Sequence, residues 1–175
     1  RGQLYRQSNQ FALGKQCFTE SIKVNPNFAC AYRVRADSES QLKDTAGAIA
    51  DLNKAISIAP EEWSSYFNRA FISQRYDKQA FDDYSLAIRV CPEFPYAYIN
   101  RAPMQEQYGT RQRALDDYNR YINLEPQNTH GYSGKADLEL RTGNLLGAYL
   151  DCNKAIELDP QNYQAYHTRG QLRQQ

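Results

Sequence analysis

Apolar residues along the chain recur at the spacing of an amphipathic α-helix. Ala114, Tyr118 and Ile122 follow one another at intervals of four, which places them on one face of a helix with 3.6 residues per turn. In the preceding segment, Tyr98 and Ala102 stand in the same i, i+4 relation. Small residues on such a face let two helices approach closely, and large residues beside them fill the remaining space. The pattern predicts packed pairs of helices.

This helical pattern is repeated along the whole chain. Five prolines lie at intervals of 34, 32, 34 and 34 residues: Pro26, Pro60, Pro92, Pro126 and Pro160. Six residues after each proline is a tyrosine: Tyr32, Tyr66, Tyr98, Tyr132 and Tyr166. Nine and ten residues after it come a base and then a small residue: Arg35-Ala36, Arg69-Ala70, Arg101-Ala102, Lys135-Ala136 and Arg169-Gly170. Isoleucine stands four residues before each of these five prolines. Because proline cannot continue a helix, each unit is predicted to end there.

These offsets resemble those of the tetratricopeptide repeat, a helix–turn–helix unit with an aromatic and a small residue followed by Ala, an aromatic and Pro. The resemblance covers the whole chain. It implies an all-α fold, a right-handed superhelical solenoid of antiparallel helix pairs in which each unit contacts its neighbours. This chain departs from the family pattern in carrying a base where the family has Leu before the small residue. It also lacks the aromatic three residues after the small one, where Glu39, Ser73, Gln105 and Glu139 stand instead.

The repeat predicts a single array over residues 1–175. Its units are a truncated repeat at 1–28, complete repeats at 29–62, 63–94, 95–128 and 129–162, and the first helix of a further repeat at 163–175. Neither end carries an obvious polar cap, so the array is expected to continue in a longer parent protein. The repeat 63–94 is two residues short, and the loss falls around Arg75–Gln79. A tight turn without the usual glycine is therefore expected there.

A carboxylate accompanies the base of each complete repeat. Asp51, Asp83, Asp117 and Asp151 lie nine residues before a proline, each on the second helix of a unit whose first helix carries the base. Two interpretations stay open: an ion pair between the two helices of each unit, or a charged track for a ligand. The first predicts that loss of one partner destabilises its unit.

Composition removes several classes of function. With 21 basic and 20 acidic residues the net charge is +1, which gives no electrostatic basis for binding nucleic acid or an anionic membrane. No apolar run is long enough to insert in a bilayer. The four cysteines are scattered without a CxxC pair, which is typical of reduced thiols and of an intracellular, cytoplasmic protein.

Catalytic chemistry is not expected. His130, Ser133 and Asp137 share one helical face, but the histidine is not placed between the serine and the acid, as a catalytic triad requires. Phosphate-binding, dinucleotide-binding and zinc-protease motifs are missing from the sequence. The protein is therefore predicted to be a non-enzyme without cofactor or metal.

The family resemblance also implies where a partner binds. First helices line the concave face of such arrays, and the residues 4, 7, 8 and 11 after each proline are expected to face it. In the repeats 63–94 and 95–128 the candidate partner-binding residues are Phe67, Asn68, Phe71, Tyr96, Ile99, Asn100 and Pro103. The same positions elsewhere hold Cys30, Arg33, Val34, Asp37, His130, Ser133, Gly134 and Asp137.

The apolar members of this set are predicted to form an exposed patch, which usually marks an interaction site. Asn68 and Asn100 are interpreted either as partners for the backbone of an extended peptide or as bonded to a neighbouring first helix. Asp37 at a groove position argues against the carboxylate clamp with which some tetratricopeptide proteins hold acidic C-termini.

Pro103 stands inside a predicted helix, eleven residues after Pro92. It has no N–H for the Ile99 carbonyl and its ring crowds that carbonyl, which costs about 3 kcal/mol in an ordinary helix. It also disfavours helical dihedrals at Ala102. A kink over 99–103 is predicted, facing the groove.

Together these features predict a non-catalytic scaffold that binds a protein, either as a peptide or as a helix, in the groove of units 63–128. Two alternatives stay open. One is a structural subunit of a larger assembly, and the other is a substrate-recruiting arm of a multidomain enzyme such as a glycosyltransferase.

Overall fold

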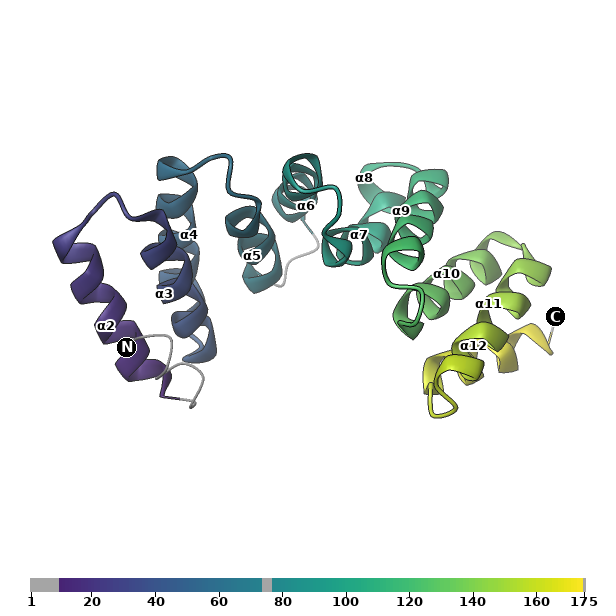
Figure 1. Cartoon of the computed structure of the whole chain (residues 1–175). Helices are drawn as coiled ribbons and strands as arrows, with labels where there is room; N and C mark the ends of the chain where they lie inside the picture. Colours follow the sequence, from purple (N-terminus) through teal and green to yellow (C-terminus); the bar gives the residue numbers. More distant parts are fainter. Residues whose placement is uncertain (1–9, 74–76, 175) are drawn as a thin grey trace. The chain divides into compact units, whose positions relative to one another are not determined.

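The computed structural model describes residues 10–73 and 77–174, and all regular structure in these ranges is helical. Figure 1 shows the helices following one another in antiparallel pairs. Their bounds are α2 Phe11–Val24, α3 Ala29–Gln41, α4 Thr45–Ile58, α5 Trp63–Ser73, α6 Lys78–Val90, α7 Pro95–Arg101, a 3-10 turn η1 Ala102–Met104, α8 Gln105–Tyr108, α9 Arg111–Leu124, α10 Thr129–Thr142, α11 Leu145–Leu158 and α12 Tyr163–Leu172. The all-α fold predicted from the repeat is confirmed.

The chain divides into two compact units, Arg1–Pro92 and Glu93–Gln175. In the first, α2 packs on α3, α3 on α4, α4 on α5 and α5 on α6. In the second, α7 packs on α9, α9 on α10, α10 on α11 and α11 on α12. Within each unit, successive helices are therefore nearest neighbours, as expected for a repeat array.

Helix ends are set by local chemistry. The second helices α4, α6, α9 and α11 begin after side chains that accept a backbone N–H of the first turn, such as Asp44 from Gly47 and Thr110 from Arg113. Each of these helices ends two residues before the proline of its repeat, as does α2, which ends at Val24, two residues before Pro26. Gly143 ends α10 with φ 82°, a left-handed conformation that glycine adopts without steric cost.

The predicted helix crossings are confirmed. Ala36, Ala70, Ala102 and Ala136 are buried, and Tyr32, Tyr66 and Tyr98 are 8–9% exposed. The tyrosine hydroxyl also donates to the carbonyl of the proline six residues before it, at 3.2 Å from Tyr32 to Pro26 and 3.1 Å from Tyr66 to Pro60. One tyrosine thus packs the crossing and ties down the turn before its own helix.

The helix that contains Pro103 is interrupted where the sequence predicted. Helix α7 is followed by one 3-10 turn at Ala102–Met104, and α-helical structure resumes in α8. The expectation for Ala102 is wrong, because this residue keeps helical dihedrals of φ −49° and ψ −50°. Ala102 is fully buried in a cluster with Ala114, Tyr118 and Leu138, and this packing holds the backbone helical.

Two sequence predictions concern residues outside the described ranges. The start of the truncated first repeat, residues 1–9, is one of them. The other is part of the short turn of repeat 63–94, where α5 ends at Ser73 and α6 begins at Lys78, capped by Asp77.

Candidate functional site: the exposed faces of the first helices

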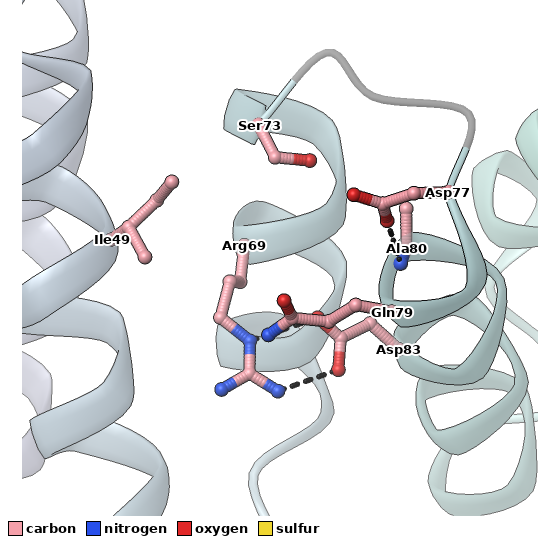
Figure 2. Close-up of a pocket in the computed structure, with 7 residues that line it drawn as sticks. All are labelled: Ile49, Arg69, Ser73, Asp77, Gln79, Ala80 and Asp83. Carbon is pink, nitrogen blue, oxygen red and sulfur yellow. Dashed lines mark hydrogen bonds and ion pairs between the residues drawn. The ribbon is translucent and has the colours of Figure 1, made fainter.

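The repeated bases pair with the repeated carboxylates of their own units. Arg35 donates two hydrogen bonds of 2.6 Å to the Asp51 carboxylate, from Nε and Nη2. Arg69 and Asp83 form the same fork at 2.8 and 2.6 Å, and Figure 2 shows the two side chains meeting between α5 and α6. Arg101 pairs with Asp117 at 2.9 and 2.7 Å, and Lys135 with Asp151 at 3.0 Å. The interhelix ion pair is confirmed, and these charges are engaged within the fold rather than along a ligand track.

The position that lacks the family's aromatic extends this polar network. Gln105 is 3% exposed and donates from Nε2 to Asp117 at 3.1 Å. Glu39 meets Lys15 at 3.0 Å, and Glu139 accepts from Asn144 at 3.1 Å. Burial raises the pKa of both Glu39 and Glu139, because a carboxylate away from water loses hydration. From the sequence, these residues were identified only as departures from the family pattern. Their shared position, thirteen residues after a proline, was a signal of a shared role.

In the first compact unit, two candidate residues form an aromatic stack. The rings of Phe67 and Phe71 are 5.8 Å apart and nearly parallel at 14°. Phe67 is partly buried and also contacts the ring of Tyr84 on α6, whereas Phe71 is 57% exposed. Asn68, between them on α5, is partly buried. The exposed anchor of this face is therefore Phe71, resting on Phe67.

In the second compact unit, the exposed candidates are Tyr96 and Pro103. Tyr96 is 45% exposed and packs edge-on against Tyr121, with centroids 6.3 Å apart. The Asn100 amide donates to the Tyr96 carbonyl at 2.7 Å within the same helix. The sequence suggested either a bond to a peptide backbone or a bond to a neighbouring first helix, and neither describes this donor. Ile99 packs against the buried cluster around Tyr118.

These contacts correct part of the predicted patch. Phe67 and Ile99 were expected on a surface not required for folding, yet both pack against the second helices of their own repeats. The four apolar candidates also belong in pairs to different compact units.

Two of the other positions expected to face the groove are buried, and a third lies against a neighbouring helix. Val34 is 5% exposed and Ser133 is 1% exposed. Gly134 lies so close to the Tyr118 ring that a Cβ would stand 2.6 Å from it. At these positions, neighbouring helices cross closely enough to cover the side chain. The exposed part of each first-helix face is therefore narrower than the repeat pattern suggested.

The polar stripe on α10 has no convergent arrangement. The ring of His130 faces Asn128 at 2.8 Å, Ser133 donates to the Thr129 carbonyl, and Asp137 pairs with Arg141 at 3.1 Å. Each side chain is occupied by a different local partner.

The described residues offer little else for small-molecule chemistry. Over residues 10–73 and 77–174, no group of three or more His, Cys, Asp or Glu side chains is placed to hold a metal ion. A pocket of about 40 Å³ beside the Arg69–Asp83 pair is lined by Ile49, Ser73, Asp77, Gln79 and Ala80 (Figure 2). Because sites for small molecules generally span about 300–1,000 Å³, this pocket is smaller than ligand sites generally are. None of the helices in the described ranges is both long and apolar enough to cross a bilayer.

The fold and the pairwise packing define an α-helical repeat protein. A family model described as tetratricopeptide repeat matches residues 1–62. This segment therefore belongs to the tetratricopeptide repeat family, which confirms the resemblance seen in the repeat offsets. No curated protein matches the chain in sequence.

Solved structures extend the likeness in fold to nearly the whole chain. MamA is 18% identical, with a TM-score of 0.81 over 93% of this chain and 96% of its own. YrrB, described as a tetratricopeptide protein with an unusual peptide-binding site, is 14% identical, with a TM-score of 0.82 over 97% of this chain and 88% of its own. PilF of Pseudomonas aeruginosa is 16% identical, with a TM-score of 0.83 over 98% and 79%. All of these matches concern the fold.

Proposed function

We propose that this protein is a non-catalytic interaction scaffold that binds a peptide or a helix of a partner protein on the exposed faces of its first helices. The observation that carries the proposal is Phe71, 57% exposed and stacked on Phe67. A solvent-exposed aromatic already held in place by a second ring loses little side-chain entropy on binding, which favours its use as an anchor.

The second compact unit supplies a comparable face. Tyr96 is 45% exposed and is supported by Tyr121 below it. The 3-10 turn that contains Pro103 directly follows α7, the helix that carries Tyr96. Because proline has no N–H, the Ile99 carbonyl lacks its usual i+4 donor. The peptide-binding description of the similar YrrB structure supports the same class of function.

A peptide library displayed on phage and selected on the 175-residue chain tests this proposal. The affinity of a selected peptide is then measured by calorimetry for wild type, Phe71→Ala and Tyr96→Ala. Truncation of a binding anchor costs about 2 kcal/mol, so an affinity loss of about thirtyfold is expected for the variant whose face binds that peptide. Unchanged affinity in both variants, with helical content intact, contradicts the proposal.

A structural subunit of a larger assembly is the second candidate, and one observation favours it. The second helix α11 exposes Leu146 at 71%, Leu150 at 58% and Tyr149 at 48%. The corresponding residues of α9 are Gln112, Asp116 and Leu115, so α9 lacks this apolar stripe. If partner recovery depends on Leu146→Ala/Leu150→Ala and not on Phe71→Ala, the second-helix surface is the interface and this candidate replaces the first.

A further inference from the structure

The repeat 95–128 carries a large residue at a position where the other units are small. Tyr121 lies five residues before Pro126, and the same position before the other four prolines of the repeat holds Ser21, Ala55, Ala87 and Ala155. Tyr121 is 1% exposed, and its ring packs against the ring of Tyr96 with the centroids 6.3 Å apart. The buried tyrosine therefore gives Tyr96 a support that an alanine is too small to provide.

A third ring completes this aromatic group. The ring of Phe94 lies 5.7 Å from that of Tyr96 and is inclined to it by 55°, whereas Tyr121 is inclined to Tyr96 by 65°. Neither neighbour is stacked parallel on Tyr96, which stays 45% exposed between them. Because the face of an aromatic ring carries a negative electrostatic potential, an exposed ring held in this way can attract a cation.

A carboxylate lies beside the same rings. Glu125 follows Tyr121 by one helical turn, at the end of α9. Burial raises the pKa of Tyr121 to about 12, and the nearby Tyr96 and Glu125 contribute to the shift, because a negative charge close to a phenol disfavours its ionisation. With the other described residues, the Glu125 side chain makes no ion pair and no hydrogen bond.

The chain itself shows what a tyrosine and a carboxylate bind when they lie together. In three complete repeats an arginine guanidinium lies over a tyrosine ring, at 5.7 Å for Arg35 on Tyr32, 6.0 Å for Arg69 on Tyr66 and 6.0 Å for Arg101 on Tyr98. Each of these guanidinium groups also donates to an aspartate of its own repeat. Tyr96 and Glu125 supply the same two components, and no described Lys or Arg lies over this ring or pairs with this carboxylate.

We propose that Tyr96 and Glu125 bind an arginine side chain of a partner peptide, with the guanidinium stacked on the Tyr96 ring and hydrogen-bonded to the Glu125 carboxylate. Phe94 and Tyr121 hold the Tyr96 ring in place. Arginine fits this pair better than lysine, because a planar guanidinium stacks on a ring through its face while its edge donates to a carboxylate. The inference rests on the proposed function, since it names the residue that the Tyr96 face takes from a peptide.

The first experiment tests the site without a peptide. The 175-residue chain, labelled with ¹³C on its tyrosine rings, is titrated with methylguanidinium chloride, which has the arginine head group, and with the neutral methylurea at the same chloride concentration. The Tyr96 signal is the one that Tyr96→Phe removes. Methylguanidinium should shift this signal in a saturable way at millimolar concentration, whereas methylurea should not. Tyr163, which is 84% exposed, serves as the reference for non-specific effects on a ring in solvent.

Protein variants test the role of the carboxylate. Glu125→Gln should weaken methylguanidinium binding about tenfold or more, because hydrogen bonds between charged groups contribute at least that factor. The matched control is Asp159→Asn, at the same offset before the next proline, which should leave the affinity unchanged. Equal responses to methylguanidinium and methylurea, or an unchanged affinity in Glu125→Gln with helical content intact, overturns the proposal.

A second experiment connects the site to a partner. A phage-selected peptide that loses affinity for Tyr96→Ala is synthesised with each arginine in turn replaced by citrulline, which is similar in shape and neutral. One replacement should weaken binding to the wild-type chain about tenfold and should have little effect on binding to Glu125→Gln. Tyr96-dependent peptides in which no arginine contributes to affinity would overturn the proposal. If selection yields no peptide while methylguanidinium binds at Tyr96, the proposed function fails and the arginine site stands.

Discussion

The ion pair between Arg101 and Asp117 is predicted to be the costliest polar contact to break in the second compact unit. Asp117 is 4% exposed and accepts from Arg101 Nε at 2.9 Å, from Arg101 Nη2 at 2.7 Å and from Gln105 Nε2 at 3.1 Å. Asp117→Ala removes this shared acceptor from the guanidinium and the amide. Removing one partner of a buried pair costs about 3–5 kcal/mol, and the 17% exposure of the Arg101 side chain favours the lower end, about 3 kcal/mol.

Urea unfolding followed by far-UV circular dichroism measures this cost. The matched control is Asp116→Ala, because Asp116 is the neighbouring exposed carboxylate and accepts a hydrogen bond along its own helix from Gln112. Its expected cost is below about 0.5 kcal/mol.

The double variant Arg101→Met/Asp117→Ala separates a pair from two independent side chains. Once the guanidinium that has lost Asp117 is removed as well, more than half of the lost stability should return, since an apolar replacement of a buried pair is often close to neutral. A loss below about 1 kcal/mol for Asp117→Ala, or a double variant as unstable as the sum of the single variants, would refute the reasoning.

Three further predictions concern single residues. Burial raises the pKa of Glu139, so its stabilising protonated form is fully present below the unfolded-state pKa of about 4.3 and is lost as pH rises through the folded-state pKa. Glu139→Gln should therefore be more stable than wild type in thermal melts at neutral pH and indistinguishable from it near pH 3; a lower melting temperature at neutral pH would contradict this. Lys43 has φ 63° at the position where the later repeat has Gly143, so Lys43→Gly should stabilise the protein by about 0.5–1 kcal/mol in urea titrations, and any loss of stability would show the strain argument to be wrong. Cys152 is fully buried and its pKa is raised to about 11 by burial, so a disulfide reagent should label it only on unfolding, unlike the partly exposed Cys17, Cys30 and Cys91. Equal labelling rates for all four thiols would disprove that prediction.

Much of the fold could be predicted because each repeat carries the same types of residue at the same offsets from a proline. Proline ends the second helix and alanine marks the crossing. The base and the aspartate each keep a fixed offset from a proline, which places the two charges on facing helices. The break at Pro103 was predictable for the same reason, since it follows from a missing N–H and a ring clash within one helix. These features depend on a few residues near one another in sequence.

The extent of the candidate surface could not be predicted in this way. Phe67, Ile99, Val34 and Ser133 share the offsets of exposed residues, yet the crossing of adjacent helices covers them to different degrees. Ala102 shows the same limit, because its helical dihedrals reflect burial against Ala114 and Tyr118 rather than the preference of a residue before proline.

Phe67 and Phe71 show this division most directly. By itself, the sequence determined that both lie on one face of the same helix, four residues apart. Only the tertiary structure decided that Phe67 is partly buried against Tyr84 and that Phe71 is 57% exposed. The periodicity of a helix selects the face on which a side chain lies, but burial depends on which other segment packs against that face.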